Sequence, residues 1–167
     1  MYVDKSLNIS RFFNEDFIIK PIDGFGSRDL MLQTLVVEKP DVVLMQDTFT
    51  TYFRPTPFLA MMKILKHLGK TVAVLPVRQN GKALHVRGAL KSFNKVATDN
   101  IAWLTPIHDV GVPIVCIDPA ATLLWRDEYP HATQQAVHAC VLLPQEWLIV
   151  QNLEKLRLEG VWRLFPH

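Results

Sequence analysis

The sequence predicts an α/β fold, namely a Rossmann-like three-layer module with a mostly parallel sheet of about four to five strands. Apolar runs of strand length alternate along the chain with segments of helix length. This alternation favours parallel strands joined by right-handed helical crossovers, with helices on both faces of the sheet. The chain has 167 residues, of which 49% are hydrophobic, and this length suits one substantial core better than two independent domains.

Four apolar runs are predicted to be the strands of this sheet. They comprise residues 41–46, 71–75, 112–117 and 136–143. Each run is followed by polar residues or by proline, which is where a strand of this length is expected to end.

Helices are predicted between these runs. The first covers residues 57–68, with Gly69 as its C-cap, and its apolar residues recur at helical spacing: Phe58, Met61, Met62, Leu65 and Leu68. The second covers residues 89–104 and is expected to end because of Pro106 and Gly111. A short helix follows Pro119, and Pro144 begins the last helix at its first position.

Residues 1–40 are the least regular part of the chain. We predict that they form an N-terminal arm that packs on the core, and that residues 41–167 form the α/β domain. The arm contains Gly24-Phe25-Gly26, which has only two glycines of the dinucleotide-binding fingerprint and follows no convincing strand. This segment therefore predicts a turn.

Composition excludes several classes of function. The 18 basic and 16 acidic residues are spread along the chain and give a formal charge of +2, so nucleic acid is not an expected partner. Cys116 and Cys140 each lie in an apolar run, where a buried thiol acts as a small hydrophobe. Two cysteines cannot by themselves supply a structural zinc site, and no apolar run approaches the ~20 residues of a transmembrane helix.

Three loops follow predicted strands and therefore fall at the carboxyl edge of the sheet, where binding sites collect in such folds. They comprise residues 47–53, 78–85 and 118–126. Asp47 is placed like the nucleophile of a haloacid-dehalogenase-type phosphatase, but position 49 is Phe. The general acid and the second Mg²⁺-binding carboxylate of that motif are therefore missing.

The second loop holds the densest basic group of the chain, comprising Arg78, Lys82, His85 and Arg87. Together with the Gly81 amide, this loop could bind an anion, or it could be a solvated polar loop. No pair of histidines has the spacing of a metal site, and no nucleophile, base and orienting group can be assembled from the sequence. We therefore predict no catalytic residue and no metal site in this chain.

The same three loops resemble the Cys-Cys-Gly-type, cysteine-rich domain of FAD-linked, iron-sulfur D-lactate and D-2-hydroxyglutarate dehydrogenases. Residues 43–52 (Val-Leu-Met-Gln-Asp-Thr-Phe-Thr-Thr-Tyr) keep the Phe and Tyr of that family's Cys-Phe-x-x-Tyr motif. Residues 76–82 (Pro-Val-Arg-Gln-Asn-Gly-Lys) keep only the glycine of Cys-Cys-Gly. Residues 119–130 (Pro-Ala-Ala-Thr-Leu-Leu-Trp-Arg-Asp-Glu-Tyr-Pro) are similar to Pro-Ser-Cys-Leu-Leu-Thr-Leu-Arg-Asp-Glu-Tyr-Pro.

The resemblance implies that the cluster ligands of that domain are lost. Thr48, Gln79, Asn80 and Ala121 stand where the family has cysteine, and these side chains cannot replace the thiolates that hold an iron-sulfur cluster. The chain is therefore identified as a degenerate copy of the domain. It is expected to hold no cofactor itself, whereas FAD and an iron-sulfur cluster are implied for the parent protein.

The resemblance also implies a role in a larger polypeptide. The last residues, 160–167, resemble the strand that precedes the family's second cysteine-rich half. We expect a non-catalytic structural or interaction domain whose partners are a ferredoxin-like domain and that second half, with Asp47, Asn80 and Arg126 as polar contacts. The parent would be a cytoplasmic FAD-dependent oxidoreductase, with any membrane contact peripheral. The alternative from the residues is an anion-binding module that uses Arg78, Lys82 and His85.

Overall fold

The computed structural model describes residues 19–21, 28–135 and 141–153. Its centre is a five-stranded sheet in the order β1-β3-β2-β4-β5, in which every pair of neighbours is parallel. The strands are β1 (Ile19–Pro21), β2 (Val42–Met45), β3 (Val72–Val74), β4 (Ile114–Cys116) and β5 (Val141–Leu142). The predicted fold class, with its parallel sheet of four to five strands, is confirmed.

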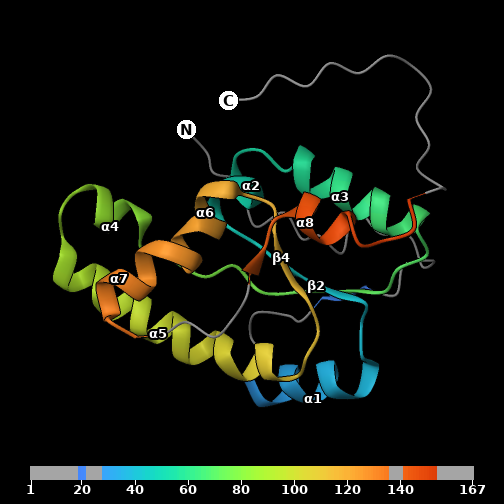
Figure 1. Ribbon diagram of the computed structural model, residues 1–167, viewed down its shortest axis with the longest axis horizontal. Coiled ribbons are helices and arrows are strands. Elements are labelled where there is room, and N and C mark those ends of the chain that lie inside the picture. The colour runs from blue at the N-terminus through green and yellow to red at the C-terminus, as the bar shows by residue number, and fades with distance from the viewer. Residues whose placement is uncertain (1–18, 22–27, 136–140, 154–167) are drawn as a thin grey trace.

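Helices cover both faces of the sheet. In Figure 1, α3 (Thr56–His67) and α8 (Pro144–Leu148) lie above the strands, and α1 (Arg28–Glu38) and α5 (Leu90–Asp109) lie below them. Because the central strands are buried on both faces, they consist of continuous apolar runs without polar alternation. The molecule therefore has the three layers that the sequence predicts.

The two faces of the sheet bury separate clusters of side chains. The α3 and α8 face joins Val42, Leu44 and Val74 to helix residues that include Met62, Leu65 and Trp147. The opposite face joins Val43, Ala73 and Ile114 to the inner sides of α1 and α5 and to the segment after β4. Alternate strand residues belong to opposite clusters because successive side chains of a strand point to opposite faces.

The strand predictions are confirmed in position, with two differences. Strand β1 was not predicted, and it lies in the segment that the sequence assigned to the N-terminal arm; α1 lies there too. β1 is an edge strand paired with β3. The fourth predicted run contains β5, while residues 136–140 lie outside the described residues. The predicted turn at residues 24–26 also lies outside them, and the proposed division at residue 40 stays a prediction.

The helix predictions hold for α3 and α8 but are wrong about Pro106. Helix α5 continues through Pro106 to Asp109, and Gly111 follows the end of the helix with a φ of +84°. A proline inside a helix removes one N–H donor and leaves the oxygen four residues earlier without its helical partner. That residue is Ala102, which is exposed, so water can bond to its oxygen and the helix continues.

The segments after β2 and β3 are not the simple loops that we predicted, because part of each is helical, and the segment after β4 is helical too. They contain α2 (Thr48–Tyr52), α4 (Lys82–Val86), and a run of α6 (Pro119–Leu123), the π-helix η2 (Leu124–Glu128) and α7 (Tyr129–Thr133). Aspartates cap α2 and α6, and Gly81 begins α4. The predicted short helix after Pro119 is thus confirmed. In the parts of the chain that the structure describes, no helix is long and apolar enough to cross a membrane.

Candidate functional site

The topology places one crevice at the carboxyl edge of the sheet, between β2 and β4. From β2 the chain crosses to β3 through α3 on one face, whereas from β4 it crosses to β5 through η2 and α7 on the other face. The two connections therefore leave neighbouring strands in opposite directions. Such a switch point is where open α/β sheets bind their ligands.

This crevice is almost completely filled by side chains. The cavity that remains has a volume of about 20 Å³, which is room for roughly one water molecule. Its lining brings together all three predicted segments and the middle of α5: Met45, Gln46, Asp47, Pro76, Arg78, Asn80, Asn100, Trp103, Ala121 and Trp125. Of the predicted site residues, Asp47, Arg78, Asn80 and Ala121 thus meet here.

In the first segment, the buried carboxylate of Asp47 is used to cap α2. One oxygen accepts hydrogen bonds from the backbone N–H groups of Phe49 and Thr50, at 2.7 and 3.0 Å. The Thr50 hydroxyl donates to the other oxygen. An N-cap of this kind satisfies N–H groups that have no partner inside the helix. Thr48 itself is exposed and is not part of the cavity lining.

In the second segment, Arg78 and Asn100 form the polar side of the cavity. Arg78 Nε donates to Asn100 Oδ1 at 3.0 Å, and its guanidinium lies over the Trp103 ring, 4.6 Å from the ring centroid. Asn100 is buried on α5 and donates from Nδ2 to the backbone oxygen of Gln79 at 2.9 Å. The Gln79 side chain is not part of the lining. The cation over an aromatic ring and the buried amide hold the loop in place.

Tyr129 fixes the same loop from the opposite side. Its hydroxyl donates to the backbone oxygen of Asn80 at 2.7 Å and accepts from Asn100 Nδ2 at 2.8 Å. Burial raises the pKa of Tyr129 to about 12. Tyr129 therefore stays protonated and able to donate at any ordinary pH. The Asn80 side chain is also occupied, since its Oδ1 accepts from the Lys82 backbone N–H at 3.0 Å.

The glycine in this segment, Gly81, has a steric role. Gly81 has a φ of +74° and is the N-cap of α4. A Cβ atom there would lie 3.0 Å from the Phe93 ring and 3.2 Å from Val96 Cγ1. A residue with a side chain would be strained by its backbone and crowded by its neighbours.

In the third segment, Asp118 caps α6 by accepting hydrogen bonds from Ala120 and Ala121 N–H groups at 3.3 and 3.2 Å. Ala121 is buried against the cavity. Cys116, at the end of β4, is completely buried, and burial raises the pKa of its thiol to about 12. A thiol in this state neither reacts nor binds metal readily.

Residues 126–129, which we call the Arg-Asp-Glu-Tyr frame, connect the π-helix to three other parts of the fold. Arg126 Nε donates to the Val141 oxygen at 2.7 Å, and its terminal nitrogens bind both carboxylate oxygens of Glu146, at 2.9 and 2.5 Å. These hydrogen bonds, followed by one from the Leu143 N–H, lower the pKa of Glu146 to about 2. Glu128 pairs with Lys82 and, at 2.6 Å, with His85 Nδ1. Arg126 thus lies at β5 and α8, away from the crevice.

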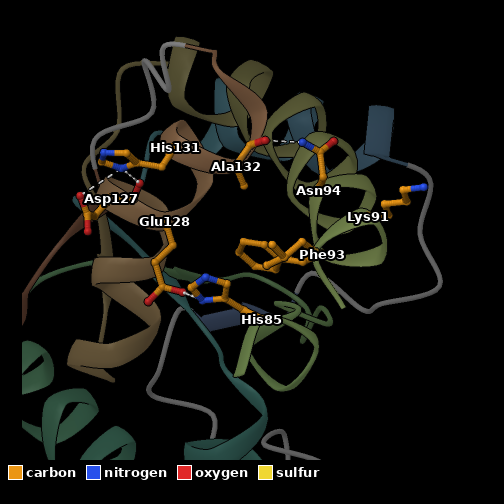
Figure 2. Close-up of a pocket in the computed structure, with 9 residues that line it drawn as sticks. His85, Lys91, Phe93, Asn94, Asp127, Glu128, His131 and Ala132 are labelled. Carbon is orange, nitrogen blue, oxygen red and sulfur yellow. Dashed lines mark hydrogen bonds and ion pairs between the residues drawn. The ribbon is translucent and has the colours of Figure 1, made fainter. Parts of the chain in front are cut away.

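A larger and more open cavity lies beside the crevice, between α4, α5, η2 and α7 (Figure 2). Its volume is about 790 Å³. In Figure 2, Phe93 and Asn94 lie on one side of this cavity and Asp127, Glu128 and His131 on the other, with His85 next to Glu128. The His85 ring stacks on Phe93, with centroids 4.6 Å apart, and His131 Nδ1 lies 3.3 Å from Asp127 Oδ1. Each imidazole is thus matched with its own carboxylate.

Most polar side chains of the crevice and of the larger cavity are paired within the protein, which limits the chemistry that they can perform. Within residues 19–21, 28–135 and 141–153, no three His, Cys, Asp or Glu side chains are grouped so as to hold a metal ion. The crevice offers an amide, a capped carboxylate and a methyl group where a cluster would need thiolates, so the residues present do not fit an iron-sulfur cluster. His85 is paired with Glu128, and among the described residues no serine, cysteine or threonine lines the larger cavity beside it as a nucleophile.

The basic residues predicted to bind an anion do not converge on one point. Lys82 and His85 both turn to Glu128, Arg78 turns to Asn100, and Arg87 Nε donates to the oxygen of Ala83 at 3.2 Å. Anion binding by this loop stays a prediction, and it would require these internal contacts to be exchanged.

Sequence reasoning missed Asn100 and Trp103, which are central to the crevice. A signal was present, because Asn100 lies on the apolar stripe of α5 with Phe93, Ala97 and Leu104. A polar side chain on the buried side of a helix needs hydrogen-bond partners, so its position pointed to a buried network. Its partners come from positions 78, 79 and 129, and only the folded chain brings them together.

Comparison with known proteins shows that this chain is similar in sequence to segments of much longer proteins. It is 44% identical over 128 residues to a D-2-hydroxyglutarate dehydrogenase of Pseudomonas putida, in an alignment that covers 75% of the chain and 13% of that protein. The corresponding proteins of Haemophilus influenzae and Escherichia coli are 34% and 36% identical over 146 and 131 residues. These alignments cover 78% and 75% of the chain.

The chain therefore spans only 13–14% of the length of the curated relatives that it matches. About three quarters of it is homologous to one segment of those dehydrogenases. No family model and no solved structure matches the chain.

Proposed function

We propose that this chain is a non-catalytic structural and interaction module of a large protein of the D-2-hydroxyglutarate dehydrogenase family. The proposal rests on the similarity of 34–44% identity to one segment of those proteins. It also rests on the filling of the crevice by side chains, which is the single observation that supports a non-catalytic role. Where a ligand would enter such a fold, a cavity of about 20 Å³ remains.

The filling of the crevice is specific, which supports a structural role. Asp47 is occupied by the helix that it caps, and Asn100 and Tyr129 are occupied by the loop that they hold. Buried polar networks that are completely satisfied fix one arrangement of the chain. The four degenerate positions, Thr48, Gln79, Asn80 and Ala121, would then contribute to shape and not to metal binding.

In the parent polypeptide, FAD would accept electrons from a D-2-hydroxy acid, D-2-hydroxyglutarate or D-lactate, and iron-sulfur centres in other domains would carry them onward. The residues of this chain would take no part in either step. Its contribution would be a rigid carboxyl edge that other domains of the same polypeptide contact, the expected ones being a ferredoxin-like domain and a second cysteine-rich half. The fragment is then no enzyme, whereas the parent is an FAD-dependent oxidoreductase.

Anaerobic reconstitution with iron and sulfide tests the non-catalytic part. We expect the purified chain to remain colourless after desalting and to retain no stoichiometric iron, because the crevice supplies no thiolate. The full-length polypeptide serves as the control and should gain an iron-sulfur absorption band under the same conditions. A stoichiometric band in the 167-residue chain would contradict the proposal.

Placement in a larger protein is tested by the coding sequence on both sides of the segment. We expect it to encode the flavin-binding and ferredoxin-like parts in one reading frame. A reading frame limited to these 167 residues would refute this part of the proposal.

A further inference from the structure

Helix α2 and Phe53, the residue that caps its carboxyl end, present three large aromatic side chains to solvent. Phe49, Tyr52 and Phe53 are 57%, 44% and 70% exposed. The rings of Phe49 and Phe53 lie 6.0 Å apart with an interplanar angle of 22°. We call these three residues the aromatic face of α2. Aromatic side chains gather at protein interfaces more than elsewhere on a surface, and a contiguous exposed cluster marks an interaction site.

The fold holds this face in a defined position. Asp47 caps the start of α2, the Thr51 hydroxyl donates to Gln46 Oε1 at 3.2 Å, and the N–H groups of Phe53 and Arg54 donate to the Phe49 oxygen at 2.9 and 3.0 Å. Gln46 is in turn fixed, because its Nε2 donates to the Leu75 oxygen at 3.0 Å. A preformed aromatic cluster loses little entropy when a partner covers it.

The face lies at the carboxyl edge, next to the closed crevice. The N-terminal ends of α2 and α6 both contribute to the crevice lining, through Asp47 and Ala121, and Figure 1 shows the two helices on the same side of the sheet. The five residues of α2 carry no charge, so the surface is suited to an apolar partner.

The size of this surface favours a partner in the same polypeptide over a second copy of the chain. A large aromatic side chain has about 150–250 Å² to bury, and since these are about half exposed, the three together offer roughly 300 Å². A stable complex between separate molecules needs about 800 Å² from each partner. A small surface suffices when the partner is covalently linked, because linkage raises its effective concentration to about millimolar.

We propose that the aromatic face of α2 is the docking surface for an apolar patch on another domain of the same polypeptide. This inference rests on the proposed function, since it requires that the chain be one segment of a longer protein. The bound domain would cover the carboxyl edge above the closed crevice. The crevice would then contribute stiffness beneath the interface.

Hydroxyl-radical footprinting of the isolated chain and of the full-length polypeptide tests this proposal without relying on a variant. We expect the modification rates of Phe49, Tyr52 and Phe53 to fall at least about five-fold in the full-length polypeptide, because the centre of an interface excludes water. Phe58, which is buried on the inner side of α3, serves as the internal control and should react slowly in both. Equal rates for Tyr52 in the two proteins would overturn the proposal.

A pair of matched variants identifies the docking contact. Replacing Phe49→Ser and Phe53→Ser in the full-length polypeptide should return the Tyr52 rate to that of the isolated chain. The control replaces two exposed valines of α1, Val36→Ser and Val37→Ser, and should leave Tyr52 protected. Both double variants should shift the melting temperature of the isolated chain by less than about 3 °C, because exposed positions contribute little to stability. Protection of Tyr52 that survives the double aromatic variant would overturn the proposal.

Two further outcomes separate this inference from the proposed function. Protection of Tyr52 that grows with the concentration of the isolated chain would identify a second copy as the occupant and overturn the proposal. Stoichiometric iron in the isolated chain would refute the non-catalytic role, while the footprint would still decide the docking surface. A reading frame of only 167 residues would overturn both the docking proposal and the proposed function.

Discussion

The hydroxyl of Tyr129 donates a 2.7 Å hydrogen bond to the backbone oxygen of Asn80, which lies 49 positions earlier in the chain. This bond joins the Arg-Asp-Glu-Tyr frame after β4 to the segment after β3. Asn100 completes the connection by donating to both Tyr129 and the Gln79 oxygen. The segments after β3 and β4 are thus held together by neutral hydrogen bonds.

Replacing Tyr129→Phe should lower the free energy of unfolding by about 1–3 kcal/mol, because it leaves a partly buried acceptor without its donor. The Asn80 oxygen would lose the Tyr129 hydroxyl, while the ring packing against Phe93 and Trp125 would remain. Urea denaturation of the isolated chain measures the change. Tyr52→Phe, at an exposed position, is the control and should stay within about 0.5 kcal/mol of the wild type.

Gly81→Ala should destabilise the chain more than Gly69→Ala does. The two glycines have nearly the same φ, +74° and +70°, but a Cβ at Gly69 would meet nothing within 4 Å. Both substitutions carry the backbone penalty of about 1–2 kcal/mol, and Gly81→Ala adds about 1–3 kcal/mol from crowding against Phe93 and Val96. Thermal unfolding of the two variants measures the difference. Equal melting temperatures would show that Phe93 moves aside without cost.

The Arg126–Glu146 pair predicts a dependence of stability on acidic pH. The pKa of Glu146 is lowered from 4.5 to about 2, so the folded state favours the ionised carboxylate. The stabilisation from this pair is therefore complete above pH 4.5 and is lost as the pH falls towards 2. Urea midpoints between pH 5 and pH 2, taken as assay conditions bracketing that window, should fall less in Glu146→Gln than in the wild type.

Arg126→Lys provides the matched variant for this pair. It keeps the positive charge but cannot bind both oxygens of Glu146 at once, as the guanidinium does. We expect the acid-dependent loss of stability to be smaller than in the wild type but still present. A Glu146→Gln variant with the full wild-type pH dependence would assign the effect to other carboxylates.

Cys116 should react with thiol reagents only when the protein unfolds. Its side chain is fully buried at the end of β4, and burial raises the pKa of the thiol to about 12. In a Cys140→Ala background, we expect disulfide-exchange labelling at pH 8 to be at least about a thousand-fold slower in the folded chain than in denaturant. Rapid labelling without denaturant would show that the end of β4 opens locally.

The repeated signals in the sequence predicted the fold well. The strands and the helix α3 follow from runs of apolar residues whose burial any parallel sheet would require. The predicted end of α5 at Pro106 was wrong. The local rule that proline breaks a helix does not say whether the backbone oxygen that loses its hydrogen-bond partner can bond to water instead. The prediction of loops at residues 47–53 failed for a similar reason, since one capping aspartate is enough to begin a short helix.

The candidate site was predicted only in part. The sequence identified Asp47, Arg78, Asn80 and Ala121, and they do line one crevice. It grouped Lys82 and His85 with Arg78, whereas the structure turns both towards Glu128. Side-chain direction depends on the neighbours that each residue meets, and local spacing in a loop does not determine those neighbours.

The sequence by itself determined the layers of this protein and the absence of thiols at positions 48, 79, 80 and 121, because burial patterns and residue identity are properties of the chain. Only the tertiary structure decided which side chains fill the crevice between β2 and β4. Asn100, Tyr129 and Arg78 come from elements far apart in sequence and satisfy one another across the crevice. A buried hydrogen-bond network needs each donor within about 3 Å of its acceptor, and only the packing of α5 against the end of the sheet sets those distances.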